Sequence, residues 1–151
     1  MRDIIALALW ALLPAVLPNF PGQEVSEGQD VVVHLVDPSS GRPVDRVRVR
    51  LTLGDPRAPH TPQLEGRTGR DGAVVFHLKP PLPALLFVND EVESVASCSH
   101  VLFQTAQVIS AGVVADDVCH HKRKPKGSYT PKPGEIIVFA QKLRWWEKFQ
   151  D

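Results

Sequence analysis

Prolines and glycines divide this chain into short segments. The 151 residues include 14 prolines and 10 glycines, and proline is about twice as frequent as in an average protein. So many breakers in a short chain require many turns, which favours several short strands over long helices. The hydrophobic fraction of 43% is enough for a packed core and argues against disorder. We therefore expect one domain built mainly from strands.

Alternation of apolar and polar residues locates these strands. Across 47–53 every second residue is Val or Leu, and Arg48, Arg50 and Thr52 lie between them, so one face should be buried and the other solvated and basic. The dipeptide Asp71-Gly72 is a hairpin-turn signal. Further apolar segments predict strands at 30–36, 73–78, 84–88, 101–103 and 135–143.

One segment, 104–117, is ambiguous. Ala106, Ile109 and Val113 fit one short amphipathic turn of helix, which Gly112 would end. Strand–helix–strand alternation is absent from the sequence, which argues against a parallel α/β sheet. The predicted fold is all-β: an antiparallel Greek-key β-sandwich of about seven strands, transthyretin-like or immunoglobulin-like, with at most short helices.

The N-terminus carries an apolar segment, Ile4–Leu17. A bilayer span needs about 20 residues, so 14 fit the apolar region of a secretory signal peptide better. An uncleaved anchor or a lipid-facing tail is the main alternative, and a buried helix would be broken early by Pro14 and Pro18. We expect a signal peptide or anchor over 1–21, a linker over 22–29, a sandwich domain over 30–143 and an aromatic-basic tail over 144–151.

The two cysteines agree with export. Cys98 and Cys119 both follow the apolar segment, and an even count in an exported protein predicts one disulfide. The alternative is two free buried thiols, but the surroundings of Cys119, "DDVCHHKRK", are very polar. The expected location is therefore secreted, periplasmic or cell-envelope, with membrane association through 4–17 as a further possibility.

Charge excludes one class of partner. The chain has 17 basic and 17 acidic residues, so no global field favours nucleic acid and we expect no nucleic-acid partner. The densest local charge is Lys122, Arg123 and Lys124, which is either a solvated loop or a patch for anionic surfaces.

Two stretches resemble a known group of domains. "VVVHLVDPSSGRPVDRVRVRLTL" and "GRTGRDGAVVFHL" are similar to the opening of transthyretin-like domains and of the wider carboxypeptidase-regulatory-like group. The shared elements are a strand ending at Asp37, a turn with Gly41 and Pro43, and the later Thr68, Asp71 and Gly72. The resemblance covers about residues 30–78, and it implies the sandwich fold with a non-catalytic binding or structural role.

One member of that group is an enzyme, the 5-hydroxyisourate hydrolase. Its H-x-x-D element matches His34 and Asp37, but Ala73 stands where its arginine would be and the chain ends "EKFQD" instead of the Tyr-Arg-Gly-Ser tail. A small hydrolase using His34 is therefore only the alternative function. No nucleophile elbow, phosphate loop or H-E-x-x-H motif occurs, so we expect no catalytic residue and no cofactor.

Histidines offer a second alternative. His34 shares a strand face with Val32 and Val36, and His77 lies similarly beside Val75, so each is best explained as a scaffold side chain. The two would form a metal site only if they met across a sheet. His120 and His121 with Cys119 are another possible ligand set, although a disulfide competes for Cys119, so the expected metal set is empty.

The chain ends in an aromatic cluster. Trp145, Trp146 and Phe149 would share one broad face of a helix, bordered by basic residues. They either close one end of the sandwich or dock on a protein partner or membrane interface. The predicted function is a secreted or envelope-associated, non-catalytic binding or structural module, the alternatives being the hydrolase and a metal- or carbohydrate-binding module. Oligomerisation through an edge strand is also expected to be possible.

Overall fold

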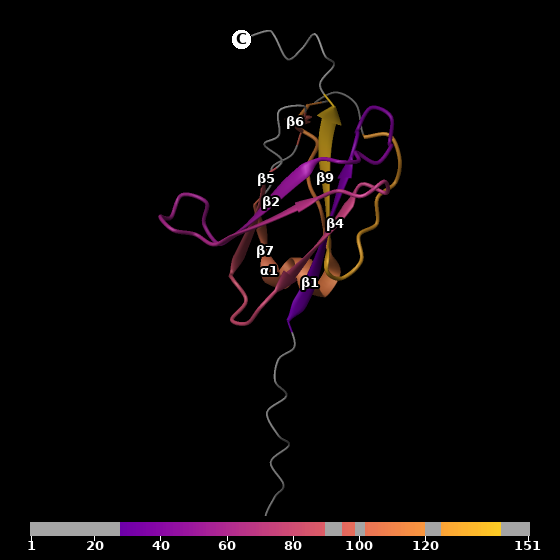
Figure 1. Ribbon diagram of the computed structural model, residues 1–151. Helices are drawn as coiled ribbons and strands as arrows, with labels where there is room; N and C mark the ends of the chain where they lie inside the picture. The colour runs from indigo at the N-terminus through magenta and orange to yellow at the C-terminus, as the bar shows by residue number, and fades with distance from the viewer. Residues whose placement is uncertain (1–27, 90–94, 99–101, 120–124, 143–151) are drawn as a thin grey trace, which may run out of the picture.

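The domain consists of two β-sheets and one short helix (Figure 1). A computed structural model describes residues 28–89, 95–98, 102–119 and 125–142. The elements within these ranges are β1 (Gln29–Val36), β2 (Arg48–Leu53), β3 (Gln63–Arg67), β4 (Ala73–Leu78), β5 (Leu85–Asn89), β6 (Val95–Ser97), β7 (Leu102–Gln104), α1 (Thr105–Ala111), β8 (Val113–Val114) and β9 (Glu135–Lys142).

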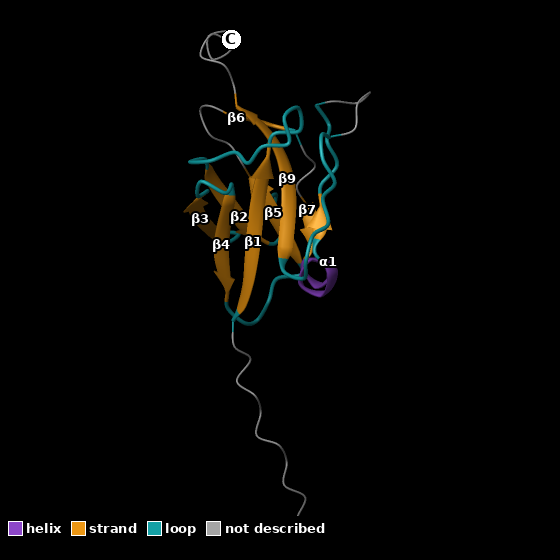
Figure 2. Ribbon diagram, turned by 90° about the vertical axis from the view of Figure 1, so that its right-hand side faces the viewer, coloured by secondary structure: helices purple, strands orange, loops and turns teal. Residues whose placement is uncertain are grey.

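The strands divide into two layers, one in front of the other in Figure 2. The β1 sheet has the order β4-β1-β9-β6, with β8 also paired to β9, and the β2 sheet has the order β3-β2-β5-β7. The predicted β-rich, two-sheet architecture is therefore confirmed. Nine strands occur among the described residues, against about seven expected, because β6 and β8 have only three and two residues and β3 lacks an apolar pattern.

We expected wholly antiparallel pairing, but two of the strand pairs are parallel. Strands β1 and β8 both run parallel to β9, while the other neighbours are antiparallel. Parallel neighbours need a long connection. Here the chain between β1 and β9 supplies it, because it passes through the β2 sheet and α1 before returning to β1.

Alternating side chains fill the space between the sheets. In β1 Val31, Val33 and Leu35 are fully buried, and Val49 and Leu51 of β2 face them from the other layer. Each fully buried Val or Leu side chain contributes about 1.5–3 kcal/mol relative to an exposed one. The outward Arg48 is exposed, which confirms the predicted buried and basic faces of β2, although Thr52 is buried as well.

Strand β3 is not among the strands that the sequence predicts. Its sequence, QLEGR, has one large apolar residue and a glycine, so alternation gave no strand signal. The glycine is required by packing, because a Cβ at Gly66 would lie 2.5 Å from Cγ2 of Val74. A turn at Asp71-Gly72 is present, but it joins β3 in one sheet to β4 in the other and is not a hairpin within one sheet.

The helix has the predicted end but not the predicted buried face. Gly112 caps α1 at φ 73°, and its N–H donates to the carbonyl of Val108. The buried residues of α1 are Thr105 and Val108, whereas Ala106 is exposed and Ile109 half-buried. The pattern placed the buried side one residue out of register, because Val113 belongs to β8 and not to the helix.

A second, smaller core lies on the outer side of the β1 sheet. Val36, Ile137 and Phe139 pack there with Cys98, and the ring of Tyr129 stands edge-on to Phe139 at 5.3 Å between centroids. The predicted disulfide between Cys98 and Cys119 is present, with a Cα–Cα distance of 5.0 Å. It fastens the segment after β8 to this face. None of the helices in the described ranges has the length and apolar character needed to cross a membrane.

Candidate functional site

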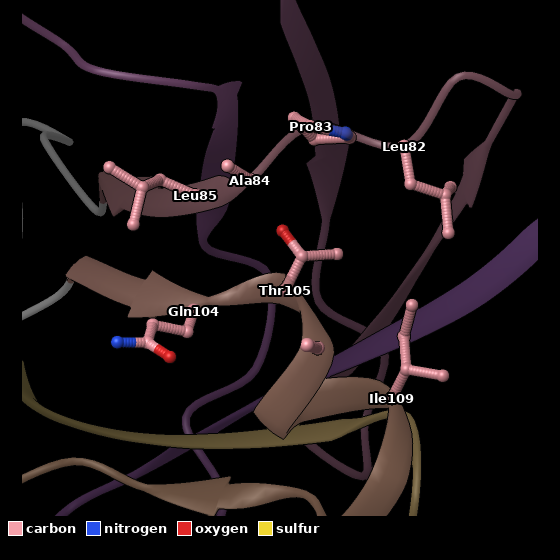
Figure 3. Close-up of a pocket in the computed structure, with 8 residues that line it drawn as sticks. Leu82, Pro83, Ala84, Leu85, Gln104, Thr105 and Ile109 are labelled. Atoms are coloured by element: carbon pink, nitrogen blue, oxygen red, sulfur yellow. The ribbon is translucent and has the colours of Figure 1, made fainter.

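An apolar pocket opens between α1 and the segment that leads into β5. It has a volume of about 540 Å³, within the range typical of small-ligand sites. Figure 3 shows its lining side chains arranged around Thr105, and the lining residues are Leu82, Pro83, Ala84, Leu85, Gln104, Thr105, Ala106 and Ile109.

Local sequence explains why this hollow forms. Prolines at 80, 81 and 83 prevent β4 from continuing, so the chain leaves the β1 sheet and reaches β5 through an irregular segment. The N–H of Thr105 donates to the carbonyl of Ala84 at 3.0 Å, which ties the start of α1 to this segment. Leu85 and Gln104 are register partners on β5 and β7. Backbone hydrogen bonds therefore fix the strand ends and the helix that form the pocket walls.

The chemistry of the pocket is that of a binding site for apolar groups. No lining side chain is titratable, and Gln104 supplies the polar group at its edge. The Thr105 side chain is 3% exposed, and its hydroxyl has no hydrogen-bond partner among the described residues. Because that hydroxyl lies beneath the surface, the walls offer carbon contacts and no acid, base or nucleophile.

The sequence pattern does not predict this pocket. In "KPPLPALL" it predicts only a break followed by a strand. Apolar residues between prolines, at positions that a strand cannot occupy, were the available signal. Ala106 and Ile109, which we expected to face the core, are pocket-lining residues instead.

His34 lies on the outer face of the β1 sheet, as its parity predicted. Its Nε2 is buried and 3.7 Å from Oε1 of Glu135, too far for a hydrogen bond. The other oxygen of Glu135 accepts a hydrogen bond from the N–H of Lys132 at 2.9 Å. The register partner of His34 on β4 is Ala73. The position where the hydrolase resemblance requires an arginine therefore adjoins His34 but carries only a methyl group.

His77 does not meet His34. It is the register partner of Asp30, and its Nδ1 contacts Oδ1 of that residue at 2.5 Å. Asp30 and His34 are four positions apart on β1, a distance of about 14 Å along the strand. The two strand histidines therefore share a face without forming a common ligand set.

One acidic group stands close to the disulfide. Asp117 has a carboxylate oxygen within 4.8 Å of the sulfurs of Cys98 and Cys119. Both sulfurs are consumed in the disulfide, so neither is a thiolate that could bind a metal. The oxidised site is thus a covalent staple and not a metal centre.

Several predicted site residues lie outside the described ranges. They are Lys122, Arg123, Lys124, His120, His121, Trp145, Trp146 and Phe149. The predicted basic patch, metal alternative and aromatic docking tail therefore stay predictions. The expected leader at 1–21 and most of the linker at 22–29 lie outside as well, although β1 already begins at Gln29.

Comparison with known proteins yields one distant likeness. No family model matches the chain, and no curated protein matches it. Among solved structures, the crystal structure of a 9R-lipoxygenase from Cyanothece PCC8801 is similar with 10% sequence identity and a TM-score of 0.35. The match covers 79% of this chain and 17% of the lipoxygenase. The chain thus spans about a sixth of that protein, and a TM-score this low supports no conclusion about fold or activity.

Proposed function

We propose that this protein is an exported, non-catalytic binding module that receives an apolar group of its partner in the pocket between α1 and the β4–β5 segment. The observation that carries the proposal is the pocket itself. Its walls are apolar, it has a volume of about 540 Å³, and its lining includes no titratable side chain. Such a site favours binding through burial of carbon and offers no group for acid–base chemistry.

Export is supported by the disulfide. Disulfides persist in oxidising compartments and are rare in reducing ones. Cys98 is fully buried, so the bond is part of the folded domain. Together with the apolar segment Ile4–Leu17, this favours a secreted, periplasmic or cell-envelope location. We also propose that the domain belongs to the carboxypeptidase-regulatory-like or transthyretin-like group, because its sequence resembles that group over 30–78.

The alternatives receive less support. The hydrolase would need a cation beside His34, and Ala73 occupies that position. A metal site through the strand histidines would need them to converge, but they are separated along β1 and β4. The metal or carbohydrate alternative near His120 lies outside the described residues and stays a prediction. We therefore place none of these alternatives ahead of the binding module.

Titration with a simple apolar probe tests the proposal. We expect 1-octanol to shift the methyl resonances of Leu82, Leu85 and Ile109 in a saturable manner, because these side chains line the pocket. The substitution Ala106→Phe should fill the pocket and abolish saturable shifts, while the domain stays folded because residue 106 is exposed.

A matched control is available on the same helix. Ala111 is also exposed but does not line the pocket, so Ala111→Phe should leave octanol binding within about twofold of the wild-type value. Shifts that never saturate, or equal binding by the Ala106→Phe variant, would show that the pocket is not a binding site.

A further inference from the structure

The outer face of the β2 sheet combines two kinds of exposed side chain. We call it the basic–apolar face. By alternation along the strands it carries Gln63, Glu65, Arg67, Arg48, Arg50, Leu85, Phe87, Asn89, Leu102 and Gln104, together with the buried Thr52. Its cations lie on β2 and β3, and its large apolar side chains lie on β5 and β7.

The basic end contains two arginines side by side. Arg48 and Arg67 are direct register partners across β2 and β3, and both are exposed. Like charges in that position destabilise a sheet. The neighbouring Arg50 is neutralised by Glu65, at 2.8 Å from Nη2 to Oε1. No described carboxylate lies within ion-pair distance of Arg48 or Arg67. Among the described residues, both charges are thus without an ion-pair partner.

A buried threonine holds the segments that carry these arginines together. The Thr68 hydroxyl donates to the carbonyl of Val44 and accepts from the N–H of Val47, both at 2.9 Å. Its backbone carbonyl accepts from the N–H of Arg46 at 3.0 Å. Arg46 itself has φ 60° and a side chain 74% exposed. These bonds hold together the backbone segments that carry the arginines, and Nε of Arg46 lies 3.8 Å from Oδ2 of Asp45.

The other end of the face carries large apolar side chains. Leu102 is 52% exposed and opposes Phe87, which is half-buried. Leu82, beside the pocket, is 40% exposed. Phe87 in turn opposes Thr52, which lies about 14 Å along β2 from Arg48. The basic and apolar ends are thus segregated on one sheet face.

We propose that the basic–apolar face docks on an anionic phospholipid surface. Guanidinium groups form two-pronged hydrogen bonds with phosphate oxygens, and paired arginines suit a plane of head groups. The exposed Leu102 at the other end of the same face can bury in the interfacial layer. Glu65 is the sole acidic side chain on this face of the described strands, and it is already bonded to Arg50. Protein interfaces instead have an apolar centre with a polar rim, which this segregated arrangement lacks.

The proposal shares Leu85 and Gln104 with the pocket, but the arginines of the basic end do not line it. Co-sedimentation of the full chain with phosphatidylcholine vesicles, with and without about a third of phosphatidylglycerol, tests it. We expect the anionic vesicles to bind at least about tenfold more tightly, and high salt to remove that difference. The Arg48→Gln/Arg67→Gln variant should lose most of it.

The control variant removes the same number of positive charges at positions outside the basic–apolar face. Arg57 and Lys132 are exposed residues of other loops, so Arg57→Gln/Lys132→Gln should retain the preference for anionic vesicles. Both variants keep the apolar segment at 4–17, so any binding through it is common to them. Leu102→Gln should weaken binding to anionic vesicles severalfold without changing its salt dependence.

Three outcomes would overturn the proposal. One is equal loss in the two double variants, which would indicate a general charge effect. Another is release from vesicles by inorganic phosphate at constant ionic strength, which would indicate a site for free phosphate. The third is binding of polyglutamate in place of anionic vesicles, which would indicate an acidic protein partner. Octanol binding by Arg48→Gln/Arg67→Gln reports on the pocket separately.

Discussion

Asp37 shows how a single carboxylate ends a strand and starts a turn. Its Oδ1 accepts hydrogen bonds from the hydroxyl of Ser39 at 2.6 Å and from the N–H groups of Ser39 and Ser40 at 2.8 and 3.2 Å. Its own backbone carbonyl accepts from the N–H of Gly41, whose φ of 70° suits a glycine. Burial alone would raise the pKa of Asp37, but these hydrogen bonds hold it below its usual value.

The lowered pKa predicts a loss of stability in acid. Because the folded-state pKa is depressed, the contribution of Asp37 is present above the unfolded value of about 4. It is lost as the pH falls through the folded-state pKa. We expect Asp37→Asn to lower the free energy of unfolding by about 1 kcal/mol at pH 7, and the gap to the wild type to close in strong acid. Urea unfolding across this range measures it, and a gap independent of pH would contradict the assignment.

At the scale of the element, α1 divides its side chains between the core and the pocket. Val108 is fully buried and packs in the main core, whereas Ile109 is half-buried and lines the pocket. The carbonyl of Val108 also accepts from the N–H groups of Gly112 and Gly134, which links the helix end to the start of β9. Val108 therefore anchors the helix in the core, and Ile109 contributes to the wall of the pocket.

This division predicts unequal effects of two neighbouring substitutions. Val108→Ala should lower the free energy of unfolding by about 2–3 kcal/mol, because it leaves a cavity in a packed core. Ile109→Ala should lower it by less than about 1 kcal/mol, because the side chain already borders open space. Urea unfolding of both variants decides the matter, and a larger loss for Ile109→Ala would mean that the sequence-based helix face was right.

At the scale of the whole molecule, the disulfide joins distant parts of the chain. Cys98 follows β6 and Cys119 follows β8, with a sequence separation of 21. The N–H of Val118 also donates to the carbonyl of Cys98 at 2.7 Å. The disulfide holds the segment after β8 against the second core, where the ring of Tyr129 packs on Phe139. Burial and the charge of Asp37 together raise the pKa of Tyr129.

Removing the staple should weaken the whole domain. In the loop-entropy treatment a closure of this length is worth about 3 kcal/mol, so Cys98→Ser/Cys119→Ser should lose roughly that amount. Chemical denaturation of the wild type and the double variant measures the difference. Reductant should lower the stability of the wild type only, and a reductant effect on the double variant would show that it acts elsewhere.

The sequence by itself determined the β-rich class, most strand positions and the disulfide partners. The apolar run at 30–36 and the alternation in 47–53 and 73–78 are local patterns, and two cysteines permit only one pairing. Only the tertiary structure decided the parallel neighbours of β9, strand β3 and the helix face, since each depends on packing against distant residues. The same holds for both proposed surfaces. The pocket needs α1 beside the β4–β5 segment, and the basic end needs Arg48 opposite Arg67, which are 19 residues apart in sequence and meet only through strand register.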